Sequence, residues 1–399
     1  MSLSVSPLRT ARDLSALLDI LAPTFNFARP LGQRYTKIVG RKNYRVVRSG
    51  STVLGGCALL PFGQFFGGKS VPMMGVGAVG IAPEHRGQRA ASTLMQACLK
   101  EMRKRGYPLS ALYPATLPLY RSVGYEQAGV RFEVRIPAKT LNLRGTDRAA
   151  HLQVRRITAK DQPLLERCYR AKASINNGNL DRSDFIWHRV FEPRGQKTLG
   201  VAVINPKTKA AEGYTLYLQK ETPEAPYSLH LTDLVALTPD AGRRLLWFFA
   251  DHRSMTHEVV FTGTPDDPII KLLPERNYHA KLLDHWMLRI VDVAKALTMR
   301  GYSPNVAGEA HLDIEDDLVS DNAGKYLVSV NNGRAKVKRG GTGAIRLDIR
   351  GLAALYSSHV TPANLLVTGQ MDASAKAGDQ VDALQAMFAG PAPWLPDMF

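Results

Sequence analysis

Strand-like and helix-like patterns of apolar residues alternate along most of this chain. Residues 71–81 are apolar and rich in glycine, and they are followed by Pro83, which has no N–H to donate to a neighbouring strand. From Ala90 onward the apolar residues fall three or four positions apart, and Gly106 comes directly after three basic residues. The pattern predicts a strand that ends near Pro83, a turn, and an amphipathic helix that ends near Gly106.

The predicted turn has the properties of an anion site. The first N–H groups of a helix have no partners within the helix, and the helix dipole places positive charge at the same end. We therefore expect residues 87–92 to bind an anion such as a pyrophosphate, with Arg86 beside them. The alternative is an ordinary surface connection, which a Gly-x-x-Ala sequence on its own would favour.

The opening of the chain recurs near its middle. Thr-Ala-basic-Asp stands at residues 10–13 and again at 158–161, and a pair of leucines follows each copy. Such a repeat indicates that the middle of the chain folds like its first part, with the polar residues 143–148 as a linker.

The second copy has a shortened turn. Fewer residues separate Pro239 from the apolar helix at Leu245 than separate Pro83 from Leu94 in the first copy. The missing residues are those that would face phosphates. We therefore interpret the second copy as a structural repeat that holds no cofactor.

Beyond residue 290 the pattern changes to short alternating strands and a few helices. We expect a helix that starts within 291–297, strands at 310–314, 326–330, 335–338 and 344–349, and helices at 352–357 and 380–388. The acidic residues 315–317 are interpreted as a solvated loop rather than a metal site.

Composition narrows the classes of function. The 399 residues are 45% hydrophobic and 22% charged, which is typical of a globular chain with two or three domains. The three cysteines, at positions 57, 98 and 168, form no disulfide framework or zinc motif, which favours a cytoplasmic protein. Residues 1–30 match neither a signal peptide nor a membrane span.

The formal net charge of +17 admits nucleic acid, an anionic membrane surface or an anionic cofactor as a partner. Lysine and arginine are spread over the whole chain and are not interleaved with aromatic residues. The densest basic cluster, residues 334–339, alternates with apolar positions as a half-exposed strand does. We therefore expect no nucleic-acid partner.

The order of motifs resembles the GNAT superfamily of acyl-CoA N-acyltransferases. An Arg-x-x-x-x-Ala turn at 86–91 follows the first predicted strand, and a helix, a second strand at 109–113 and Tyr-x-x-x-Gly-Tyr at 120–125 come after it. More narrowly, Pro-Glu-His-Arg at 83–86 and Gly-Tyr-Pro-Leu at 106–109 are similar to the enhanced intracellular survival (Eis) family.

This resemblance implies a mixed α/β (α+β) chain of tandem GNAT folds. Residues 1–145 would form the acetyltransferase domain, 146–288 a second, degenerate GNAT-like domain without cofactor, and 289–399 a sterol-carrier-protein-like α+β domain. The family also implies a homo-oligomer, a trimer or hexamer.

The resemblance assigns acetyl-CoA as co-substrate and no metal. Pantetheine would pair with the backbone of Val79, Gly80 and Ile81, where the Ile81 N–H would polarise the thioester carbonyl. The pyrophosphate would lie on Arg86, Gly87, Gln88, Arg89, Ala90, Ala91 and Ser92. The superfamily usually has glycine in place of Arg89, so this side chain either crowds the turn or reaches the phosphates.

Two residues take catalytic roles by the same resemblance. Tyr120 matches the general acid of GNAT enzymes, and the carboxylate of the terminal residue, Phe399, matches the general base of the Eis family. The alternatives are an aromatic that packs a short helix on the sheet, as expected for Tyr113 and Tyr125, and a frayed tail. The stiff apolar residues 391–399 favour a docked tail.

The function implied is acetyl transfer to a primary amine, such as an aminoglycoside, a polyamine or a lysine side chain. Phe25 and Phe27 are candidates for the acceptor pocket by position, and core packing is their alternative. The competing hypothesis is a non-enzymatic lipid or small-molecule carrier that uses the C-terminal domain.

Overall fold

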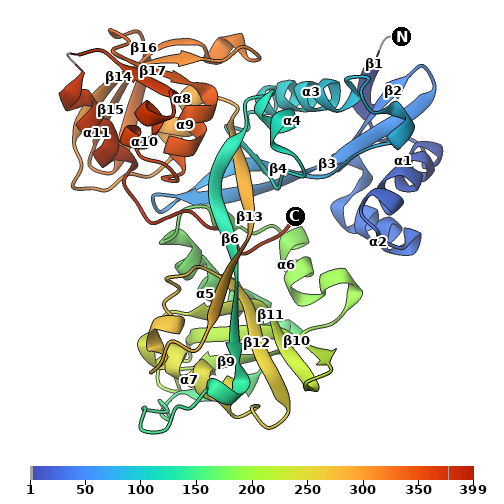
Figure 1. The fold of residues 1–399 in the computed structure, drawn as a ribbon, viewed down its shortest axis with the longest axis vertical. Coiled ribbons are helices and arrows are strands. Elements are labelled where there is room, and N and C mark those ends of the chain that lie inside the picture. Colours follow the sequence, from blue (N-terminus) through green and yellow to red (C-terminus); the bar gives the residue numbers. More distant parts are fainter. Residues whose placement is uncertain (1–2, 376) are drawn as a thin grey trace.

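The computed structural model describes residues 3–375 and 377–399, which form three bodies joined by two long strands (Figure 1). The first body contains β1 (Leu3–Pro7), α1 (Ala11–Thr24), α2 (Arg29–Val39), β2 (Tyr44–Ser49), β3 (Thr52–Phe66), β4 (Lys69–Ile81), α3 (Ala90–Lys104), β5 (Leu109–Leu112) and α4 (Leu117–Arg121). The strand expected at 71–81 and the helix expected after it are therefore confirmed as β4 and α3.

The second body repeats this order. It contains β7 (Gln153–Arg156), α5 (Gln162–Ser174), β8 (Leu180–Asp181), α6 (Asp184–Phe191), β9 (Leu199–Ile204), β10 (Ala211–Thr222), β11 (Ala225–Ala236), α7 (Pro239–Ala250) and β12 (Thr256–Gly263).

The repeated Thr-Ala-basic-Asp sequence is a capping box in both bodies. At the start of α1 the Asp13 N–H donates to the Thr10 hydroxyl at 3.0 Å, and the Asp13 carboxylate accepts from the Thr10 N–H. Thr158 and Asp161 make the same reciprocal pair ahead of α5. The sequence repeat thus starts two equivalent helices by the same local hydrogen bonds.

Two long strands, β6 (Glu126–Pro137) and β13 (His279–Ile290), connect the two bodies into one sheet. β13 lies between β5 and β6: its end pairs with β5 from Met287↔Leu112 to Ile290↔Leu109. β6 in turn pairs antiparallel with β12. Each long strand therefore completes both halves of the sheet, and Figure 1 shows the two crossing the middle of the molecule together. The domain boundaries proposed at residues 145 and 288 stay predictions.

The third body is a five-stranded sheet with helices packed on it. Its elements are α8 (Val293–Met299), β14 (Gly308–Glu315), β15 (Gly324–Asn331), β16 (Arg334–Arg339), β17 (Ile345–Asp348), α9 (Ile349–Tyr356), α10 (Pro362–Val367), β18 (Met371–Ala373) and α11 (Gly378–Phe388). The basic cluster at 334–339 is a strand, as its alternation predicts.

The interpretation of residues 315–317 as a solvated loop is wrong for Asp316. Its carboxylate is buried and forms an ion pair with Arg289 of β13, whose Nη2 lies 2.8 Å from both oxygens. Asn322 also donates to it, at 2.9 Å. The sequence did not indicate this pairing, because Arg289 lies in a strand 27 residues before Asp316. This pair fastens the third body to the shared sheet.

No helix in the described part of the chain is both long enough and apolar enough to cross a membrane.

Candidate active site

The turn between β4 and α3 occupies residues 82–89, and the predicted anion site, residues 87–92, spans the end of this turn and the start of α3. A short 3₁₀ turn, Pro83–His85, comes first, and Gly87 has φ +78° with open space around its Cα. The α3 N-terminus has no side-chain cap and no acidic residue in its first turn. Arg86 and Arg89 are exposed and form no ion pair with any described residue. Unpaired N–H groups, a helix dipole and two free guanidinium groups therefore gather at one point.

Arg89 adopts the left-handed conformation, with φ +59° and ψ 13°, at the N-cap of α3. This conformation costs a residue with a side chain about 1–2 kcal/mol, which glycine avoids. The superfamily usually has glycine here, and glycine adopts this backbone conformation without strain. Arg89 keeps the same backbone at a cost in strain, and its side chain stays in solvent.

The equivalent turn of the second body is only residues 237–238. There Thr238 caps α7 with its hydroxyl, which accepts from the Ala241 N–H at 3.1 Å, and Pro239 occupies the first helical position. The Thr238 side chain thus satisfies one of the first N–H groups of α7, and Pro239 has none to offer. The shortened turn expected from the sequence is confirmed, and the absence of a cofactor from the second body stays a prediction.

The end of β4 separates from β5 at the centre of the first body. Among the described residues, pairing between the two strands ends at Gly75↔Ala111. On its other side β4 continues to pair with β3, with one register shift opposite Cys57, where Ala78 takes φ +51°. The splayed strand leaves backbone groups of residues 76–81 available to an extended ligand on the β5 side.

Gly80 and the acceptor candidates lie around the end of α1. A methyl group at Gly80 would meet the Leu21 side chain at 2.6 Å, so α1 lies directly over this part of β4. Phe25, which follows α1, is 46% exposed. Phe27 packs instead against Gly32 in the core of the first body. Phe25 is therefore accessible to a substrate, whereas Phe27 mainly packs in the core of the first body.

Tyr120 lies in α4 and is 5% exposed. Its ring packs with Tyr125 and with the apolar face of α3, and its hydroxyl makes no hydrogen bond to another described residue. Burial, with a smaller contribution from nearby Cys57, raises the pKa of Tyr120 to about 12. The phenol thus stays protonated at neutral pH, as a general acid must.

Phe399 is docked and only 8% exposed. Its ring packs against Phe62 at 5.0 Å and Tyr113 at 5.6 Å between ring centroids. A methyl group at Gly77 would lie 3.3 Å from its carboxyl carbon, and one at Gly75 would lie 2.9 Å from its ring. The terminal carboxylate therefore rests against the splayed part of β4.

The two candidate catalytic groups face β4 from opposite sides. Tyr120 belongs to the core beneath α3, and Phe399 belongs to the core beneath α1. A thioester held along the splayed strand would lie between a proton donor on one face and a carboxylate on the other.

Sequence reasoning missed the residues that seat the tail. Gly75 and Gly77 carry a signal, because glycine within a strand marks close approach of another chain segment. Tyr113 was expected only to pack, but its hydroxyl also donates to the Asp397 carbonyl at 2.8 Å. Tyr125 packs as expected, with its hydroxyl 2.7 Å from Ser110.

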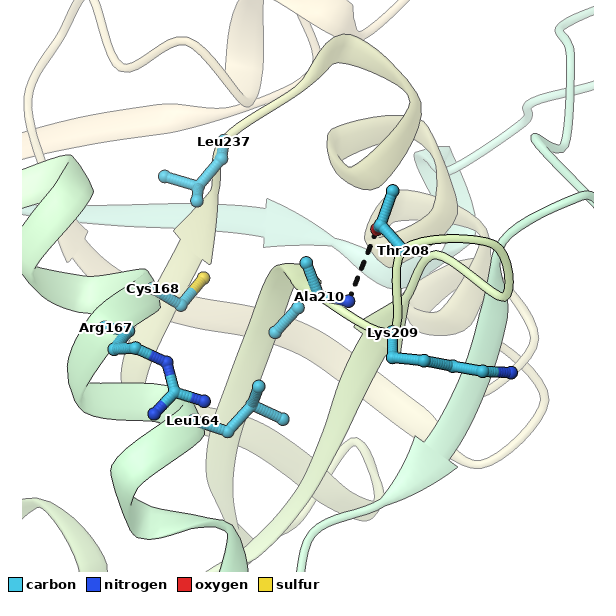
Figure 2. Close-up of a pocket in the computed structure, with 8 residues that line it drawn as sticks. Leu164, Arg167, Cys168, Thr208, Lys209, Ala210 and Leu237 are labelled. Carbon is cyan, nitrogen blue, oxygen red and sulfur yellow. Dashed lines mark hydrogen bonds between the residues drawn. The ribbon is translucent and has the colours of Figure 1, made fainter.

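A shallow cavity of about 340 Å³ lies elsewhere, in the second body between α5 and the turn before β10 (Figure 2). Burial raises the pKa of its Cys168 thiol to about 12, so this thiol is not a nucleophile at neutral pH. The described residues contain no group of three or more His, Cys, Asp and Glu side chains arranged to hold a metal. The cavity beside Cys168 is therefore not a second candidate for the active site.

Each of the three bodies matches a known domain family. Two acetyltransferase (GNAT) domain families match residues 7–128 and 178–290, and the sterol carrier protein domain family matches residues 293–396.

Whole-chain relatives agree with this arrangement. A GCN5-related N-acetyltransferase from Anabaena variabilis is 35% identical with full coverage of both chains and a TM-score of 0.93. An N-acetyltransferase of Streptomyces avermitilis is 26% identical over 84% of this chain and 83% of its own length. N-acetyltransferase Eis of Mycobacterium tuberculosis is 26% identical over 72% of this chain and 71% of its own.

The fold and the relatives define a tandem-GNAT acyltransferase with a C-terminal sterol-carrier-like domain. The chain belongs to the GCN5-related N-acetyltransferases and, among them, to the Eis-like enzymes.

The glycines beneath the tail give a first prediction. Gly75→Ala places a methyl group in steric conflict with the Phe62 ring and 2.9 Å from the Phe399 ring, and it should lower the free energy of unfolding by about 1–3 kcal/mol, measured by urea denaturation. Gly378→Ala is the matched control, because a methyl group there meets nothing within 4 Å. Equal stability of the two variants would contradict the packing of the Phe62 and Phe399 rings against Gly75.

Arg89 gives a second prediction. Arg89→Gly removes strain and charge, whereas Arg89→Ala removes the charge and keeps most of the strain. If the guanidinium reaches the phosphates, both variants should bind acetyl-CoA about tenfold more weakly by calorimetry, since a hydrogen bond to a charged group contributes roughly 1.5–3 kcal/mol. Only Arg89→Gly should melt at a higher temperature. Tighter binding by Arg89→Gly would instead identify Arg89 as a residue that crowds the turn.

Proposed function

We propose that the first body transfers the acetyl group of acetyl-CoA to a primary amine, with Tyr120 as general acid and the Phe399 carboxylate as general base. The observation that carries this proposal is the buried chain terminus, whose carboxyl carbon would be 3.3 Å from a methyl group at Gly77 on the splayed strand. Burial of a charged carboxylate against an apolar strand is costly. The position of the Phe399 carboxylate therefore favours a role in chemistry over a role in packing alone.

The residues of the turn and of β4 fit a coenzyme A thioester. Its pyrophosphate would be held by the N–H groups of residues 87–92 and by Arg86 and Arg89, and its pantetheine arm by the backbone of Val79, Gly80 and Ile81. When bound, acetyl-CoA supplies an acetyl group activated as a thioester. The Ile81 N–H would donate a hydrogen bond to the carbonyl oxygen as negative charge develops on it.

The acid and the base would work on opposite faces of β4. The Phe399 carboxylate, directly or through a water molecule, would accept the proton that the amine must lose to attack. Tyr120 would donate its phenolic proton to the sulfur as the carbon–sulfur bond breaks. Its raised pKa keeps that proton in place until then.

The acceptor is proposed to be an aminoglycoside, a polyamine or a lysine side chain that enters past Phe25, with Phe27 behind it. A cytoplasmic homo-oligomer, a trimer or hexamer, is proposed by analogy with the family. A panel of such amines, assayed for release of free thiol, would identify the acceptor class.

Tyr120→Phe should lower kcat about 100-fold or more, because general acid–base catalysis contributes roughly 10²–10⁴-fold. Acetyl-CoA affinity, measured by calorimetry, should change less than about twofold, since no binding contact is removed. Tyr107→Phe in the same body is the control, because the Tyr107 hydroxyl makes no hydrogen bond among the described residues. An unchanged kcat for Tyr120→Phe would remove Tyr120 from the mechanism.

Two glycines added after Phe399 should abolish activity, because they replace the carboxylate at the site with an amide. Acetyl-CoA binding should persist, since the pyrophosphate turn is untouched. The same two residues added at the start of the chain serve as the control. Full activity of the extended enzyme in the thiol-release assay would rule out the terminal carboxylate as base.

A further inference from the structure

The tail that carries Phe399 contains a second, deeply buried carboxylate. Asp397 is only 6% exposed, and it lies two residues before the chain terminus. A buried carboxylate is stable only when it is paired and hydrogen-bonded. Backbone hydrogen bonds already hold the tail at Trp394 and Leu395, and the partners of Asp397 hold the residues that follow.

Those partners come from the second body. Arg182, between β8 and α6, donates from Nε to one Asp397 oxygen at 3.0 Å, and its Nη2 lies 2.9 Å from the other. The Tyr169 hydroxyl of α5 lies 3.2 Å from the same carboxylate and 3.0 Å from the Leu180 carbonyl, so these two acceptors share its one proton. This side-on arrangement uses the planar guanidinium to fix both the position and the direction of Asp397.

Arg182 is itself held rigidly. Its side chain is 1% exposed, and its Nη1 lies 2.5 Å from Asp233 of β11. Its guanidinium stacks on the Tyr169 ring at 3.5 Å from the centroid, and the Tyr214 hydroxyl donates to Asp233 at 2.6 Å. Asp233 thus fixes the guanidinium from the Nη1 side, and the Nε–Nη2 edge is directed at the Asp397 carboxylate.

The tail then passes from the second body to the first within three residues. The Asp397 carbonyl accepts from Tyr113 of the first body, and the Phe399 ring packs between Tyr113 and Phe62. Figure 1 shows the chain terminus at the centre of the molecule, where the two bodies meet. One end of this short span is thus fixed by charge, and the other is the candidate base.

We propose that Arg182 and Asp397 are positioning residues for acetyl transfer: the second body binds Asp397 and thereby holds the Phe399 carboxylate in the first body's site. This inference rests on the proposed role of Phe399 as base. On this proposal the second body, in which Thr238 caps the helix at the equivalent turn, contributes to the reaction in the first body.

Asp397→Asn tests this inference in the full-length enzyme. The variant leaves Arg182 paired with Asp233, so the second body should fold normally, but the tail loses its charge-assisted anchor. We expect kcat to fall about tenfold or more while KM for acetyl-CoA stays within about twofold. Asp382→Asn is the matched control, because Asp382 is an exposed acid of α11 that makes no ion pair with a described residue.

A second measurement follows the tail itself. Carboxypeptidase A should release Phe399 slowly from the parent and the control enzymes, and at least about tenfold faster from Asp397→Asn, as recorded by mass spectrometry of the intact chain. Asp397→Glu, which keeps the charge, should recover part of the protection and part of kcat. A release rate for Asp397→Asn equal to that of the parent would overturn the inference, and so would an unchanged kcat.

The enzyme with two glycines added after Phe399 separates this inference from the proposed function. If it is inactive while Asp397→Asn is fully active, the base stands and the positioning role of Arg182 and Asp397 is wrong. If it keeps full activity, the proposed base is wrong, and the positioning role fails with it even when Asp397→Asn releases Phe399 faster.

Discussion

The pairing of β13 between β5 and β6 is the constraint on which the rest of the structure depends. The first body cannot complete its sheet until a strand more than a hundred residues further along the chain has been delivered. The second body likewise needs β6, a strand from the first half of the chain, as the partner of β12. The two halves therefore fold as one cooperative sheet, and pairing across such sequence separations makes folding slow. The same exchange sets the distance between the bodies, which the tail must span.

The parts of the structure that the sequence predicts are those with local causes. β4 ends before Pro83 because proline cannot continue a ladder, and α3 follows with its apolar stripe. The capping boxes, the shortened second turn and the strand at 334–339 have equally local signals. Tyr120 and Phe399 came from the resemblance, and their roles stay predictions.

What the sequence could not predict depends on partners distant in the chain. Asp316 looks like part of an acidic loop until Arg289 is placed beside it. Arg182 and Asp397 are separated by more than two hundred residues, and neither stands in a motif. The strand exchange leaves no mark on composition or periodicity, because a strand is amphipathic in the same way whichever sheet receives it.

The docked terminus has a consequence for when this enzyme can exist in active form. On the proposed mechanism the site is complete only when the Phe399 carboxylate lies against β4. The third body must also be complete, because the tail that reaches β4 leaves from the end of α11. Activity would then report that all three bodies had assembled around one another.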